Sequence, residues 1–122
     1  MSLRFVTKTV HAYLDYPVAI ALIALPFVLG LGATSPLALW LSVGTGIAAF
    51  ILTLLTDHHL GVLRVLPYSL HLIVDAAVGV VFLAAPFALG FGGLDAAYYW
   101  INGAAVVVVV SLHQPEDTLA AA

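Results

Sequence analysis

The sequence lacks cysteine and has very few charged residues. Among its 122 residues none is cysteine, and only 7% are Asp, Glu, Lys or Arg, against about 25% in an ordinary soluble domain. The absence of cysteine excludes disulfides, thiolate metal sites and cysteine nucleophiles. Three Lys and Arg residues are too few for a nucleic-acid-binding surface, and the scarcity of polar residues excludes a disordered chain. With 64% hydrophobic residues and a mean hydropathy of +1.19, we expect a small integral membrane protein.

The few charged residues separate long apolar stretches. No charged residue lies between Asp15 and Asp57, which leaves room for two crossings of about 20 residues each. A similar arrangement follows Asp75, with Asp95 in the second turn. Helices are expected because a spanning segment must satisfy its backbone hydrogen bonds internally. The predicted spans are about 12–31, 37–56, 70–90 and 96–112, followed by a tail at 113–122.

The chain contains an internal repeat without a gap, in which 3–57 matches 63–117. The matching pairs include Arg4 and Arg64, His11 and His71, Asp15 and Asp75, Pro26 and Pro86, Gly30 and Gly90, and Trp40 and Trp100. Each repeat is a helical hairpin, so both copies enter the membrane in the same direction and should be related by a pseudo-twofold axis along the membrane normal. The predicted fold is therefore an all-α, four-helix transmembrane bundle that forms a single domain over 1–122.

The basic residues predict the orientation. Arg4 and Lys8 precede the first span, Arg64 lies between the second and third, and the two short turns contain no Lys or Arg. The positive-inside rule makes their common side cytoplasmic. We therefore expect a plasma (inner) membrane protein with both termini in the cytoplasm.

The second repeat resembles a known family. The residues that carry the resemblance are Asp75, Pro86, Phe87, Gly90, Trp100, Asn102 and Gly103. They are similar to the SPW-repeat membrane proteins, which have a Ser-Pro-Trp motif in the first helix of each of two hairpins. Here the motif reads Leu25-Pro26-Phe27 and Ala85-Pro86-Phe87. The resemblance covers about residues 11–112, implies a tetraspan fold, and carries over no catalytic residue.

Prolines, glycines and aromatic residues mark the ends of the spans. Pro26 and Pro86 should kink their helices about one turn before the glycine-rich turns at Gly30 and Gly90. Aromatic side chains often lie at membrane interfaces. We expect such a belt near the outer turns, formed by Trp40, Trp100, Tyr98 and Tyr99, and an inner belt formed by Tyr13, Tyr16 and Tyr68.

The most informative polar residues are His11 with Asp15 and His71 with Asp75, at a spacing that places each pair on one helix face. The predicted axis could bring the pairs together, with Arg4 and Arg64 nearby. In one interpretation both Asp residues are helix N-caps or ion-pair partners that hold the inner end of the bundle. Asp15-Tyr16-Pro17 suits such a cap.

Two other interpretations give this cluster a chemical role. All five histidines are predicted on the cytoplasmic side, which allows a haem or other metal site. They are His11, His58, His59, His71 and His113. Alternatively, Asp15 and Asp75 could form a proton relay or a proton-coupled transport site.

The leading functional interpretation is a non-enzymatic membrane component, acting as a subunit, assembly partner or structural protein. No Ser-His-Asp arrangement, zinc motif or dinucleotide loop is present. No cofactor is required by this interpretation. The expected partners are the lipid bilayer, a second copy or other membrane proteins, and an apolar small molecule is a further possibility.

Overall fold

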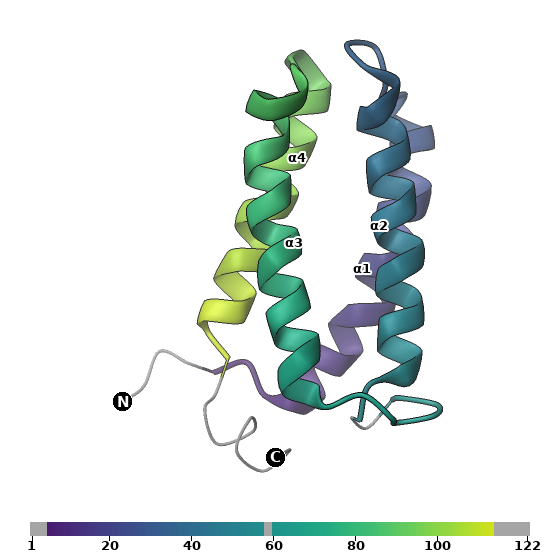
Figure 1. The fold of residues 1–122 in the computed structure, drawn as a ribbon, viewed down its shortest axis with the longest axis vertical. Coiled ribbons are helices and arrows are strands. Elements are labelled where there is room, and N and C mark those ends of the chain that lie inside the picture. The colour runs from purple at the N-terminus through teal and green to yellow at the C-terminus, as the bar shows by residue number, and fades with distance from the viewer. Residues whose placement is uncertain (1–4, 58–59, 114–122) are drawn as a thin grey trace.

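Four helices make up nearly all of the described structure. The computed structural model describes residues 5–57 and 60–113. Its helices are α1 (Lys8–Leu29), α2 (Pro36–Leu55), α3 (Tyr68–Leu89) and α4 (Gly93–Ser111). They pack as two hairpins, α1 with α2 and α3 with α4 (Figure 1). All four are long and apolar enough to cross a membrane. The predicted all-α fold of two hairpins is confirmed.

The bundle has a proximal end and a distal end. The proximal end is where α1 begins and α4 ends, and the distal end carries the short turns 30–35 and 90–92 (Figure 1). Near the proximal end, α1 runs across the base of the bundle before it rises beside α2. Pro17 lies inside α1, whereas Ala77 occupies the matching position of the straighter α3. We attribute the bend to Pro17, which removes a backbone hydrogen bond.

The recurring proline and glycine residues end the first helix of each hairpin. Gly30 and Gly90 adopt left-handed conformations with φ of 69° and 72°, which glycine adopts without steric cost. The next residue then donates its N–H back to the proline carbonyl, at 2.9 Å in the first hairpin and 3.0 Å in the second. This arrangement is a Schellman-type cap. Pro26 and Pro86 therefore act as acceptors at the helix end in addition to lacking a donor.

Within each hairpin, glycine lets two helices approach closely. A Cβ atom on Gly46 of α2 would lie 2.8 Å from the Ala19 carbonyl of α1. In the second hairpin, a Cβ on Gly103 would lie 3.0 Å from the Gly79 carbonyl. Small residues commonly stabilise membrane helix pairs in this way, because lipid supplies no hydrophobic force between helices.

The second helices of the hairpins do not follow the register of the first helices. Lys8 and Tyr68, which begin α1 and α3, are matching positions of the sequence repeat, whereas Pro36 and Gly93, which begin α2 and α4, are not. The cause is the shorter turn at 90–92, which starts α4 three residues early. Gly46 and Gly103, which make the close approaches in their hairpins, are offset from the repeat by the same amount. Residues that occupy equivalent places in α2 and α4 are therefore three residues closer together in the sequence than the repeat spacing.

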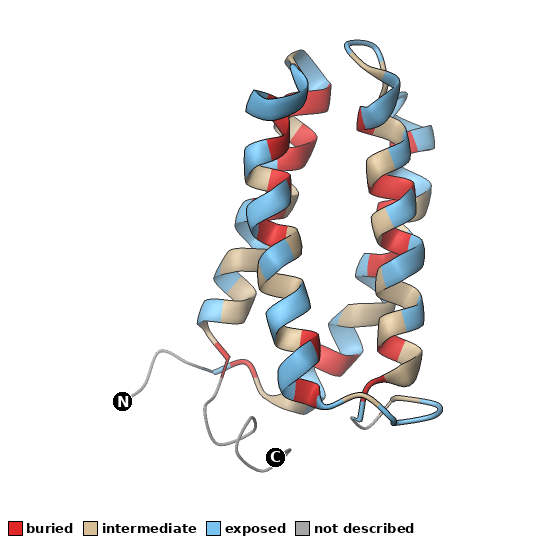
Figure 2. Ribbon diagram, in the orientation of Figure 1, coloured by how far each residue is buried: buried red, intermediate tan, exposed pale blue. Residues whose placement is uncertain are grey.

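Exposed residues cover much of the outside of the bundle (Figure 2), and many of them are large and apolar. Val28, Phe87 and Ile101 are each at least 69% exposed, as expected for a surface that contacts lipid. Trp40 and Trp100 are exposed as well, and each packs against a phenylalanine of its own hairpin, with ring centroids 6.0 Å and 5.6 Å apart.

The prediction that Tyr98, Tyr99 and Tyr68 belong to interfacial belts is wrong. All three are at most 5% exposed, because each hydroxyl has a hydrogen-bond partner inside the bundle. Tyr98 pairs with the Ser42 hydroxyl at 2.6 Å, and Tyr99 donates to the Ala38 carbonyl at 2.7 Å. Tyr13, in contrast, is 59% exposed.

The distal end joins the hairpins through one carboxylate. Asp95, in the first turn of α4, accepts hydrogen bonds from the backbone N–H groups of Gly32 and Thr34, both at 2.9 Å, and from the Thr34 hydroxyl at 2.6 Å. It is only 2% exposed. A core that includes Leu22, Phe82 and Tyr99 fills the space beside it.

Candidate metal centre

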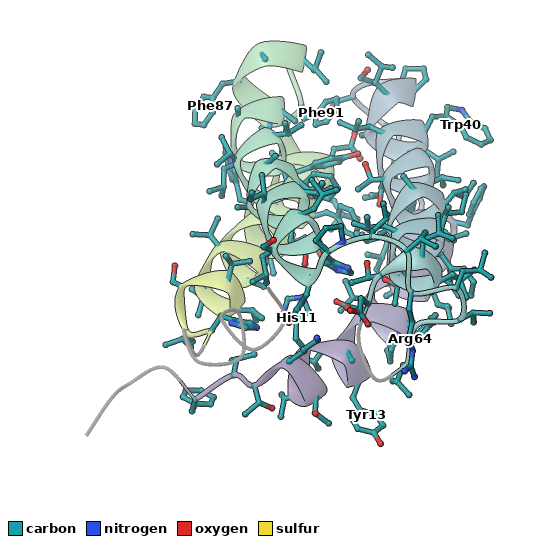
Figure 3. All side chains as sticks on the ribbon, turned by 60° about the horizontal axis from the view of Figure 1, so that its bottom comes forward. His11, Tyr13, Trp40, Arg64, Phe87 and Phe91 are labelled. Atoms are coloured by element: carbon teal, nitrogen blue, oxygen red, sulfur yellow. The ribbon has the colours of Figure 1, made fainter. Side chains whose placement is uncertain are left out.

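The proximal end brings the two repeats together through four side chains. His11 and Asp15 lie in the first two turns of α1, and His71 and Asp75 occupy the matching places in α3. We call these four residues the His–Asp cluster. Figure 3 shows His11 inside the proximal end, whereas Tyr13 of the same helix points away.

Asp15 and Asp75 are not N-caps, so the capping half of that interpretation is wrong, whereas both carboxylates do pair with histidines. Thr7 is the N-cap of α1, and its side chain accepts the Val10 N–H at 3.1 Å. Pro67 is the N-cap of α3. Each helix therefore begins about two turns before its Asp, and both carboxylates face the histidines inside the bundle.

Each imidazole of the cluster faces the carboxylates of both repeats. His11 Nε2 lies 3.0 Å from Asp15 Oδ1 and 2.8 Å from Asp75 Oδ2. His71 Nε2 lies 3.3 Å from Asp15 Oδ2 and 3.3 Å from Asp75 Oδ2. The contacts within a repeat and between repeats are thus nearly equal, as a pseudo-symmetric site requires.

The cluster is largely withdrawn from solvent. His11 is 4% and His71 2% exposed, while the side chains of Asp15 and Asp75 are 10% and 20% exposed. Two carboxylates in such surroundings need a compensating positive charge. Either protonated imidazoles or a bound cation can supply it.

Further polar and aromatic groups surround the two imidazoles. The Thr56 hydroxyl lies 2.7 Å from His71 Nδ1. The Tyr68 ring centroid lies 5.9 Å from that of His11 and 6.1 Å from that of His71. The Tyr68 hydroxyl in turn pairs with His113 Nε2 at 2.8 Å. These residues limit how far the imidazoles can turn.

The remaining predicted site residues lie elsewhere. Arg64 is in the exposed loop after α2, where its Nε donates to the Gly61 carbonyl at 3.1 Å. The centroid of the His113 ring is 5.9 Å from that of His11, and His113 pairs with the Tyr68 hydroxyl rather than with a residue of the cluster. Arg4, His58 and His59 fall outside the described residues.

The donor set of the cluster fits a divalent transition metal. Two imidazole nitrogens and two carboxylate oxygens, one from each residue, all lie within 4.8 Å of one another. A tetrahedral zinc site has ligands at about 2.0–2.2 Å from the ion, so its ligand atoms are roughly 3.3–3.6 Å apart. The imidazole–carboxylate distances of 2.8–3.3 Å lie at or below the lower end of this range, and donor pairs nearer the 4.8 Å limit would have to approach, so the site forms by small shifts in both directions. Carboxylate oxygens lie 2.8–3.3 Å from both imidazole Nε2 atoms, in the space that the iron and ring of a haem would need, so this arrangement does not suit haem.

A family comparison covers this whole arrangement. The model of the SPW repeat domain matches residues 8–113, which include all four helices and the His–Asp cluster. The chain belongs to the SPW repeat family. As an SPW repeat protein with four helices able to span a membrane, it is an integral membrane protein. The SPW family has no known enzymatic role. No curated protein and no solved structure matches the chain.

Sequence reasoning missed two important residues of this SPW repeat protein. Asp95 appeared only as a mark between two spans, although a lone carboxylate in a turn before a helix is typical of a group that binds backbone N–H donors. Thr56 gave no signal, because a hydroxyl at the end of a helix more commonly bonds its own backbone. Its contact with His71 depends on how α2 meets α3.

An apolar groove of about 250 Å³ runs between α2 and α3. Thr45 is its polar lining residue, and the rest are apolar side chains of α3 such as Ile73, Val78 and Phe82. In a membrane-spanning bundle, lipid acyl chains can fill an apolar groove of this kind.

Proposed function

We propose that this SPW repeat protein is a small, non-enzymatic membrane component that holds one divalent transition-metal ion between its two hairpins. The observation that carries the proposal is the convergence of His11, Asp15, His71 and Asp75 within 4.8 Å. Each repeat contributes one imidazole and one carboxylate, so the ion would bridge the hairpins. In the same proposal the proximal end faces the cytoplasm, in agreement with Lys8 and Arg64 on that side.

The donor chemistry supports Zn²⁺, Fe²⁺, Co²⁺ or Mn²⁺ over softer ions. Imidazole and carboxylate suit these metals, whereas Cu⁺ prefers the thiolates and thioethers of cysteine and methionine. The chain has no cysteine and one methionine. Charge favours the same ions, because one divalent cation balances two carboxylates beside neutral imidazoles.

The proton-transport alternative has less support. A relay across the bilayer needs polar groups or water along its whole path. On the distal side of the cluster, the interior between the hairpins contains the core of Leu22, Phe82 and Tyr99. The geometry therefore favours a bound ion over a conducted one.

Metal binding by the purified protein tests the proposal. The protein would be extracted in mild detergent, freed of metal, and titrated with Zn²⁺ and Co²⁺, with the bound metal quantified by elemental analysis. We expect one ion per chain, and Asp75→Asn should weaken binding at least about 100-fold because a direct ligand is lost. Asp57→Asn, a carboxylate of the same end outside the cluster, is the matched control and should bind normally. A wild-type protein that takes up neither metal would contradict the proposal.

The accessory role has a separate test. Gentle extraction from native membranes should recover the protein with other membrane proteins or with a second copy. A single, monodisperse chain under these conditions would contradict a subunit or assembly role.

A further inference from the structure

The two histidines of the cluster differ at their second nitrogen. His71 Nδ1 lies 2.7 Å from the Thr56 hydroxyl, which is fully buried. His11 Nδ1 is also buried but makes no hydrogen bond within the described parts of the chain. The site is therefore nearly symmetric at its four donor atoms but asymmetric in the hydrogen bonding of the two Nδ1 atoms.

The hydrogen bond at Thr56 determines where the proton of His71 lies. Thr56 Oγ1 donates to the Leu52 carbonyl at 2.6 Å. A hydroxyl has a single proton to donate, so towards His71 the same oxygen must act as the acceptor. His71 therefore carries its proton on Nδ1 and directs Nε2 to the two carboxylates. This is the tautomer that a metal bound at Nε2 requires.

His113 occupies the matching place in the second repeat. The backbone of Thr56 bridges to Leu66, and that of His113 bridges to Val6, the residue that matches Leu66. Thr56 N–H bonds the Thr53 carbonyl at 3.4 Å and His113 N–H bonds the Val110 carbonyl at 3.2 Å, in the same register that relates α2 to α4. A hydroxyl at position 113 would thus face His11 as Thr56 faces His71. Instead, His113 pairs with Tyr68.

We infer that Thr56 is a positioning residue that makes His71 the anchored ligand of the metal and leaves His11 as the exchangeable one. This inference rests on the proposed metal site, and it adds the order in which the two histidines release the ion. Partners of the outer nitrogen fix the orientation and basicity of a ligating histidine, and their loss commonly weakens binding about 10–100-fold. His11 Nδ1 has no such partner among the described residues, so only ring contacts restrict the His11 imidazole and it can leave the ion at lower cost.

Substitutions at Thr56 test the anchoring of His71. Thr56→Val keeps the shape and removes the acceptor, so Co²⁺ and Zn²⁺ affinity should fall about 10–100-fold. The visible spectrum of bound Co²⁺ should change as well, because the ligand is no longer held in one orientation. Thr56→Ser should restore affinity and spectrum. A purely structural role would lower stability without altering the Co²⁺ spectrum. Equal metal affinity of Thr56→Val and wild type would overturn the inference.

Substitution at His113 tests the other half of the inference. His113→Thr places a hydroxyl where His11 Nδ1 lacks a partner, so Co²⁺ should dissociate more slowly than from His113→Ala. His113→Ala is the matched control, since both variants lose the contact with Tyr68. Equal dissociation rates would contradict the assignment of His11 as the exchangeable ligand.

Failure of the inference can be separated from failure of the proposed function. If wild-type protein binds no metal, both fall. If wild type binds one ion and Thr56→Val binds it equally well, the metal site stands and the role of Thr56 falls. Each variant should first be checked for wild-type helix content by circular dichroism and for a single species in detergent.

Discussion

The proximal and distal ends of the bundle both join the two hairpins with aspartate, but by different chemistry. At the distal end, Asp95 receives hydrogen bonds from two backbone N–H groups and one hydroxyl. At the proximal end, Asp15 and Asp75 face the side-chain nitrogens of two histidines. Backbone donors cannot leave or change their charge, whereas an imidazole can be protonated, neutral or bound to a metal. The comparison indicates that the distal carboxylate has fixed hydrogen-bond partners, whereas the partners of the two proximal carboxylates can change their protonation or bind a metal.

The largest effect should come from Asp95→Ala at the distal end. The substitution removes a buried carboxylate that accepts three part-buried hydrogen bonds, so we expect a loss of about 3–5 kcal/mol of unfolding free energy. Unfolding in mixed detergent micelles would measure it. Metal stoichiometry should stay at the wild-type value as long as the variant is folded. Leu94→Ala, at the exposed neighbouring residue, is the control and should change stability little. A stable Asp95→Ala protein would remove the distinction between the two ends.

The proximal end should respond to metal and the distal end should not. At a free metal concentration 100 times Kd, binding stabilises a folded protein by about 2.7 kcal/mol. In Asp15→Asn/Asp75→Asn this metal-dependent stabilisation should disappear. The unfolding free energy without metal should change by less than the stabilisation that is lost. The measurement is the same unfolding titration with and without Zn²⁺. A double variant that Zn²⁺ still stabilises would place the ion elsewhere.

Packing within a hairpin should matter more than exposed surface. Gly103→Ala puts a Cβ 3.0 Å from the Gly79 carbonyl and from the Leu83 side chain, and we expect a loss of about 2 kcal/mol from the forced separation of α3 and α4. Gly44→Ala is the matched control, since its Cβ would meet nothing within 4 Å. Both can be compared by thermal unfolding. Equal stability of the two variants would contradict the close approach at Gly103.

The smallest effect should come from the polar contacts beside the distal core. Ser42→Ala removes the partner of the Tyr98 hydroxyl and a bond to the Leu22 carbonyl. We expect a loss of about 1 kcal/mol, the usual size of such bonds between membrane helices. Ser111→Ala loses only an exposed bond within α4 and should be neutral. A neutral Ser42→Ala would show that these two hydrogen bonds add nothing to the stability that the core and Asp95 provide at this end.

Much of the fold could be predicted from the sequence, since it depends on composition. Long uncharged stretches must become helices in lipid, and the glycine-rich turns must end them. The helical spacing of His11 with Asp15, and of His71 with Asp75, likewise placed each pair on one face. The burial of Tyr98 and Tyr99 could not be predicted in this way, because an aromatic residue near a turn suits either the interface or the interior. Only the acceptors on α2 decide between the two.

Taken alone, the sequence determined the membrane class, the number of helices and the duplication, because these follow from hydropathy and from identity between positions. Only the tertiary structure decided the spacing of α2 and α4, which depends on the length of the turn at 90–92. It also decided that the four His and Asp side chains meet, and that Thr56 reaches His71 while His11 Nδ1 has no comparable partner among the described residues. The physical reason is that these contacts join residues from different helices, and their geometry depends on how the two hairpins pack.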